Sequence, residues 1–141
     1  MPYPEVHPMK LHMSPAFLLA ALIFVYVPYT ASAAEAGSSK QFTTCMDKSG
    51  GVTSSMIECI VTENKLQDAR LNKAYKALGA DLPPARKTQL LEAQRAWIKF
   101  RDANCSFYND PDGGSMARVV ANDCLMRATT ERARELEALV E

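Results

Sequence analysis

The sequence predicts an all-α protein, a small antiparallel three-helix bundle with two disulfides. The helices are predicted by apolar residues that recur at three- and four-residue steps over three long stretches, while no stretch alternates convincingly as a strand would. The disulfides are predicted by four cysteines, an even number, which all lie after residue 44 of the 141-residue chain. A chain of this length forms one ordinary domain once any targeting segment is removed.

The first 33 residues have the layout of a secretory signal peptide. An uncharged apolar run over 16–27 follows Lys10 and is closed by Pro28, and Ala31-Ser32-Ala33 fits an A-x-A cleavage site. The alternative is a single-pass anchor, but the run is shorter than the roughly 20 apolar residues that cross a bilayer. No cysteine follows the run to accept a lipid. We therefore expect residues 1–33 to be cleaved and the mature protein to be periplasmic or secreted, without a membrane tether.

The mature chain is expected to begin with a disordered leader over 34–44, because the residues from Glu35 to Lys40 are small and polar. The folded domain is expected over 45–141. Cleavage would remove Glu5, Lys10 and both histidines, so the mature chain keeps balanced charge. Balanced charge gives no electrostatic case for nucleic acid or an anionic membrane as a partner.

The first predicted helix begins near Thr53 and ends near Leu78. Ser55 and Glu58 have the spacing of a capping box, and Gly79 supplies a stop. Two of the inward-facing residues, Glu63 and Gln67, are polar. The whole inward stripe is Met56, Cys59, Ile60, Glu63, Gln67, Leu71, Ala74 and Leu78.

The second predicted helix runs from Pro84 to Phe107 and follows a short connector, so it should form an antiparallel hairpin with the first. Hairpin register places Arg101 within one turn of Glu63, with Gln67 and Gln94 nearby. We therefore predict a structural Glu63–Arg101 ion pair; the alternative is that both side chains extend into solvent. The stripe of this helix is Leu90, Leu91, Gln94, Trp97, Ile98, Arg101 and Cys105.

A loop over 108–115 precedes the third predicted helix, which runs from about Ser115 to Val140 and could bend near Cys124. The loop is rich in Asn, Asp, Pro and Gly, which are turn-forming residues. The helix has the weakest stripe of the three: Leu125, Thr129, Arg132, Leu136 and Leu139.

Cys45, Cys59, Cys105 and Cys124 are expected to form two disulfides in an exported domain. A zinc site is the weaker alternative, since there is no paired C-x-x-C spacing and the mature chain has no histidine. Position leaves all three pairings open. We favour Cys45–Cys59 and Cys105–Cys124, because each closes a local loop and the second would brace the 108–115 loop.

Catalysis is not expected from these residues. Without histidine and with oxidised thiols, the usual pairs of nucleophile and base are missing. No phosphate-binding loop or paired metal motif appears, and the Asp110–Gly114 segment lacks the ligand pattern of a calcium loop. We therefore predict neither an enzyme nor a bound cofactor or metal, and favour a protein that binds another protein.

Residues 45 to 136 resemble the lysozyme inhibitor LprI-like family. The resemblance implies an exported helical domain of bacterial envelopes, whose named member blocks host lysozyme. That member is a lipoprotein, whereas this chain lacks the lipid-accepting cysteine. The residues that carry the resemblance are Cys45, Met56, Cys59, Glu63, Leu71, Asn72, Tyr75, Leu78, the block from Ala93 to Cys105, Gly113, Gly114, Ser115, Cys124, Thr130, Arg132, Glu135 and Leu136.

Lysozyme is largely cationic and carries its catalytic carboxyl groups in a cleft, so the acidic loop is the candidate interface. Asp110 and Asp112 could supply negative charge, while Gly113, Gly114 and Ser115 form a slim tip. One alternative is an ordinary interhelical loop in which Ser115 caps the third helix. Another exposed hot spot, Arg95 with Trp97, is less favoured because Trp97 lies on the apolar stripe. For the whole protein, the alternative function is a structural or adaptor protein of the envelope with a different partner.

Overall fold

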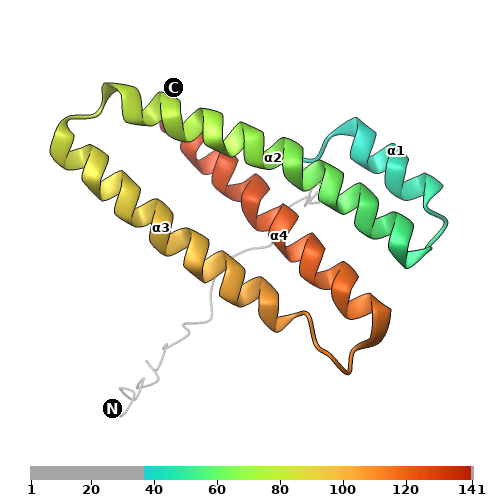
Figure 1. Ribbon diagram of the computed structural model, residues 1–141. Helices are drawn as coiled ribbons and strands as arrows, with labels where there is room; N and C mark the ends of the chain where they lie inside the picture. The colour runs from blue at the N-terminus through green and yellow to red at the C-terminus, as the bar shows by residue number, and fades with distance from the viewer. Residues whose placement is uncertain (1–36, 141) are drawn as a thin grey trace, which may run out of the picture. The chain divides into compact units, whose positions relative to one another are not determined.

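The computed structural model describes residues 37–140, and these residues form helices and connecting turns without strands. The helices are α1 (Lys40–Lys48), α2 (Thr53–Asp81), α3 (Pro84–Phe107) and α4 (Gly114–Glu137), as Figure 1 shows. The all-α prediction is confirmed, but the number of helices was underestimated, since the described part of the chain has four. The predicted signal peptide and residues 34–36 of the predicted leader lie outside the described residues.

Helix α1 lies where a disordered leader was expected, so that prediction is wrong from Lys40 onward. Ser39 acts as its N-cap: the Ser39 hydroxyl accepts a hydrogen bond of 3.1 Å from the amide of Phe42. Phe42 and Met46, one turn apart, pack against a cluster formed by Ile60, Val119 and Met126. The small polar residues that suggested a leader therefore contain the N-cap and the first residue of α1. The apolar residues that pack on the core, Phe42 and Met46, follow directly after them.

Helix α2 is longer than predicted at its C-terminal end. Its N-cap position is Val52, so Ser55 and Glu58 lie inside the helix and the predicted capping box does not form. The helix passes through Gly79 and ends at Asp81. Leu82 is extended because it precedes Pro83, and this steric restriction ends the helix.

Helix α4 packs along α2, and these two helices supply most of the core (Figure 1). One cluster joins Leu71 and Ala74 of α2 to Ala133 and Leu136 of α4. The cluster around Ile60 lies nearer the N-terminal ends of both helices. The two helices therefore run in the same direction, and the chain returns between them through α3.

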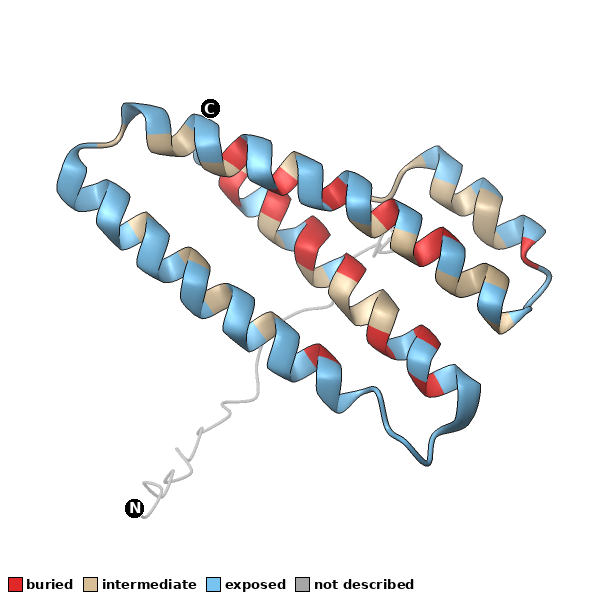
Figure 2. Ribbon diagram, in the orientation of Figure 1, coloured by how far each residue is buried: buried red, intermediate tan, exposed pale blue. Residues whose placement is uncertain are grey.

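Helix α3 is the least buried of the three long helices, as Figure 2 shows. Cys105 is its one fully buried residue. Leu90 and Trp97 are half-buried and pack against the Leu71 cluster. Leu91 and Ile98, which we expected on the inward face, are exposed. Helices α2 and α3 are consecutive and joined by a short connector, as expected for a hairpin. However, α3 packs mainly on α4 and contributes little to the core.

The two disulfides have the favoured pairing. Cys45–Cys59 joins α1 to α2 with a Cα–Cα distance of 5.7 Å. Cys105–Cys124 joins the end of α3 to α4 with a Cα–Cα distance of 5.4 Å. Each of the two peripheral helices, α1 and α3, is therefore covalently fixed to one of the two helices that build the core.

Candidate partner-binding site

The connection between α3 and α4 is a turn organised by Asp110. One carboxylate oxygen of Asp110 accepts a hydrogen bond of 2.9 Å from the amide of Asp112, and its carbonyl accepts one of 3.1 Å from the amide of Gly113. Every residue from 106 to 116 is exposed. The loop therefore has a defined conformation while both predicted carboxylates face solvent.

The two glycines of the loop are required by its backbone. Gly114 has φ of +65°, a conformation that side chains disfavour. A Cβ on Gly113 would lie 2.8 Å from the Cβ of Ala117 and 3.2 Å from that of Asp110. Helix α4 begins at Gly114, so Ser115 lies in its first turn and does not occupy the N-cap position that the alternative interpretation of the loop gave it.

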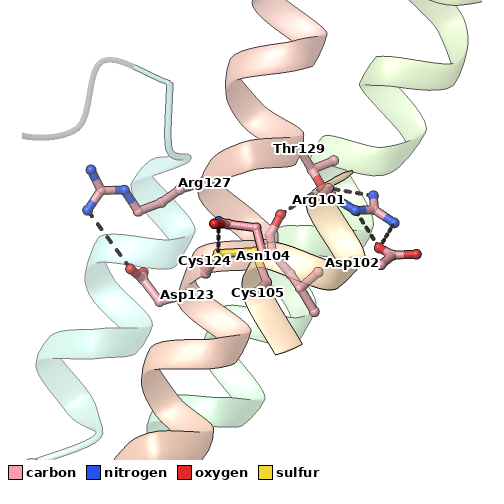
Figure 3. Close-up of a disulfide and its surroundings, with 9 residues drawn as sticks. Arg101, Asp102, Asn104, Cys105, Asp123, Cys124, Arg127 and Thr129 are labelled. Atoms are coloured by element: carbon pink, nitrogen blue, oxygen red, sulfur yellow. Dashed lines mark hydrogen bonds and ion pairs between the residues drawn. A yellow bond between two sulfur atoms is a disulfide. The ribbon is translucent and has the colours of Figure 1, made fainter. Parts of the chain in front are cut away.

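The Cys105–Cys124 disulfide, drawn in Figure 3, joins the end of α3 that precedes this loop to α4, which follows it. The side-chain amide of Asn104 donates to the sulfur of Cys124 at 3.7 Å. Asp123 lies next to Cys124 and is paired with Arg127 at 4.0 Å. Burial raises the pKa of Asp123, and the charge of Arg127 offsets part of that effect. The disulfide therefore links the two helices that the loop connects.

Two aromatic residues beside the loop were not among the predicted site residues. The side chain of Phe107 is 82% exposed, and its ring meets that of Tyr108 edge to face with centroids 5.8 Å apart. The sequence could have indicated the exposure of Phe107, because this large apolar residue does not lie on the inward stripe of its helix. The structure thus places aromatic surface next to the two predicted carboxylates.

The structure does not bring Glu63 and Arg101 together, which corrects the predicted ion pair. Arg101 pairs with Asp102 at 2.7 Å and donates to the Thr129 hydroxyl at 3.4 Å. Glu63 is 2% exposed and accepts hydrogen bonds from Ser39 and Gln67. The pair does not form because α2 packs on α4 and on the N-terminal segment, and not closely on α3.

Glu63 holds the segment that leads into α1. Its carboxylate accepts three hydrogen bonds: from the backbone amide of Ser39 at 2.9 Å, from the Ser39 hydroxyl at 2.6 Å, and from the side-chain amide of Gln67 at 2.7 Å. Gln67 also donates to the carbonyl of Gly37 at 3.1 Å and accepts from Arg70 at 3.0 Å. Arg70 continues the network to Glu137 of α4 through bonds of 2.6 and 2.5 Å. The network therefore connects the segment before α1 with helix α2 and with the end of helix α4.

The hydrogen bonds decide the charge state of these carboxyl groups. Burial raises the pKa of Glu63, but the hydrogen bonds from Ser39 and Gln67 and the charge of Arg70 together lower it by more, so the net shift is downward. The hydrogen bond from Arg70 is the main cause that lowers the pKa of Glu137. Both groups are therefore expected to be ionised at neutral pH.

The domain is expected to lose stability in acid because of these two groups. A carboxyl whose pKa is lowered on folding stabilises the folded state above its unfolded pKa, about 4.3, and this contribution is lost as the pH falls through the folded pKa. The thermal midpoint, followed by circular dichroism from pH 7 to pH 3, should fall most steeply below about pH 4.3. Glu63→Gln should flatten that dependence, and an unchanged slope would contradict this assignment.

Trp97 lies in the contact between α3 and α4, and not in an exposed hot spot. The guanidinium of Arg101 is 5.0 Å from the Trp97 ring centroid and that of Arg132 is 5.9 Å from it. Arg132 also donates to Gln94 at 3.1 Å and pairs with Glu135 at 2.8 Å. These residues of the sequence resemblance therefore join α3 to α4.

Within residues 37–140, no cluster of three or more His, Cys, Asp or Glu side chains is arranged to hold a metal ion. None of the helices in this part of the chain combines the length and the hydropathy that a membrane crossing requires.

Comparison with known proteins gives a family. Residues 45–136 match the model of the family described as lysozyme inhibitor LprI. An uncharacterised protein of Rhizobium meliloti (strain 1021) is 32% identical over 97 residues, which cover 59% of this chain and 70% of the relative. No solved structure gives a significant match. The family match covers both disulfides, the Trp97 contact and the acidic loop, and the chain therefore belongs to the lysozyme inhibitor LprI family.

Proposed function

We propose that this protein acts outside the cytoplasm as a non-catalytic binding module that inhibits lysozyme, and that the loop over 108–115 enters or covers the lysozyme cleft. Family membership supports lysozyme as the partner. The two disulfides support an oxidising compartment, the periplasm or the exterior.

The observation that carries the choice of surface is the braced acidic loop. Asp110 and Asp112 are exposed, and no Lys or Arg lies between residues 106 and 116. A negative tip is attracted to a cationic partner and accelerates its association. The disulfide, the Asp110 turn and the two constrained glycines reduce the conformational entropy lost on binding.

Neutralising the loop should weaken binding to lysozyme. In the double variant Asp110→Asn with Asp112→Asn, the side-chain oxygen of the amide introduced at position 110 can still accept the turn hydrogen bond, so charge is removed while the fold is kept. We expect an affinity roughly fivefold to tenfold lower and a weaker dependence on salt, as for two exposed charge pairs. The measurements are a lysozyme binding isotherm at two ionic strengths and the rate of cell-wall lysis.

The matched control carries the same charge change on other exposed carboxylates, Asp47→Asn with Asp81→Asn. It should bind as the parent protein does. If both double variants lose affinity equally, the loop is not the specific interface. If the parent protein in large molar excess leaves lysis undiminished, inhibition is rejected and the structural or adaptor function becomes the better account.

A further inference from the structure

Helix α3 has a second apolar line besides the one that packs on α4. Ala96, Phe100, Ala103 and Phe107 follow one another at steps of four, three and four residues, so they share one side of the helix. All four are exposed, and Phe100 is 68% exposed. At 3.6 residues per turn this line, here called the α3 ridge, lies roughly 120° around the helix from the line of Leu90, Trp97 and Cys105.

The α3 ridge makes no contribution to the core. The partly buried residues that pack on the core from α3 are Leu90 and Trp97, and its fully buried residue is Cys105. Single exposed apolar residues are ordinary, but here two phenylalanines lie two turns apart on one side of the helix, with Ala103 between them on that line, and both side chains are largely exposed. A helix with apolar residues on more than one side is typical of one that is covered on more than one side.

The ridge leads directly into the acidic loop. Phe107 is the last residue of α3, its ring contacts that of Tyr108, and Asp110 follows three residues later. The disulfide at Cys105 fixes the helix end that carries Phe107. The aromatic and the acidic surfaces are therefore held in one fixed arrangement on the same part of the molecule.

We propose that Phe100 and Phe107 are the apolar anchors of the lysozyme-binding interface, which thus extends from the acidic loop over two turns of α3. This inference rests on the proposed function. The partner it fits is a cationic protein surface with an apolar strip beside its basic rim: the rim meets Asp110 and Asp112, and the strip receives the two rings. Aromatic anchors flanked by polar groups are the residues that typically dominate binding energy.

The test compares Phe107→Ala and Phe100→Ala with Leu66→Ala, which truncates an apolar side chain of α2 that is 49% exposed. We expect each phenylalanine variant to bind lysozyme about thirtyfold more weakly, the loss typical of a hot spot. The salt dependence of binding should remain, because the loop charges are intact. Leu66→Ala should bind as the parent does, and the thermal midpoints of all three should stay close to that of the parent.

The outcomes separate the inference from the function beneath it. If the parent protein binds lysozyme and the phenylalanine variants bind equally well, the ridge is not part of the interface while the proposed function stands. If sedimentation shows a dimer that Phe100→Ala dissociates without affecting lysozyme binding, a second copy covers the ridge and the inference is overturned. If the parent protein does not bind lysozyme, both the function and the inference fail.

Discussion

Replacing Glu63 by Ala is expected to lower the free energy of unfolding by about 3 kcal/mol, because it removes a buried acceptor of three hydrogen bonds. Three donors would lose their acceptor at a buried position with little access to water: the backbone amide of Ser39, the Ser39 hydroxyl and the side-chain amide of Gln67. The N-terminal end of α1 should then detach more readily from α2. Urea denaturation gives the loss of stability, and hydrogen exchange at the amide of Ser39 locates it.

Two further variants make this result specific. Glu63→Gln keeps the shape and one acceptor oxygen, so it should lose clearly less stability than Glu63→Ala. Glu58→Ala removes an exposed carboxylate of the same helix and should change stability by less than about 0.5 kcal/mol. Equal stability losses for Glu63→Ala and Glu58→Ala would show that the Ser39–Glu63 contact does not hold the segment.

Removing the Cys105–Cys124 bridge by changing both residues to Ala should cost about 3 kcal/mol, the value expected for the chain entropy of a loop of this length. It should also weaken lysozyme binding, because the base of the 108–115 loop loses its brace. Chemical denaturation measures the first effect, and a binding isotherm under conditions where the variant is folded measures the second.

The other bridge supplies the matched control. Changing Cys45 and Cys59 to Ala should cost a similar amount of stability, again about 3 kcal/mol, since the closed loop is only slightly shorter. Its effect should be confined to α1, so lysozyme binding should stay unchanged. If both double variants weaken binding alike, the bridge at Cys105 has no special role in presenting the loop.

The long helices and the disulfide pairing could be predicted because they depend on local patterns. Three- and four-residue periodicity located α2, α3 and most of α4, and the short separation within each cysteine pair favoured the pairing that forms. Helix α1 was missed because the polar residues before it resemble a flexible leader, and its stability comes from contacts with Glu63 and the Ile60 cluster. Such distant contacts leave no local signature.

The Glu63–Arg101 pair failed for a related reason. Hairpin register tells which residues lie at the same height on two helices, but not which neighbour each side chain faces. Once α4 packs along α2, Glu63 lies against Ser39 while Arg101 meets Trp97 and Thr129. The acidic loop was recognisable from its composition, whereas the exposure of Phe107 depends on how few residues of α3 are buried.

The pairing of α2 with α4 has a consequence for how the chain becomes a folded protein. The core contacts join residues such as Leu71 and Ala133, which are separated by all of α3 and the acidic loop. A chain that lacks its last helix has lost the main surface against which α2 buries its apolar residues, so α2 and α3 alone should stay open. Folding is therefore expected to wait until nearly the whole polypeptide has emerged, which suits the export that we propose for this protein.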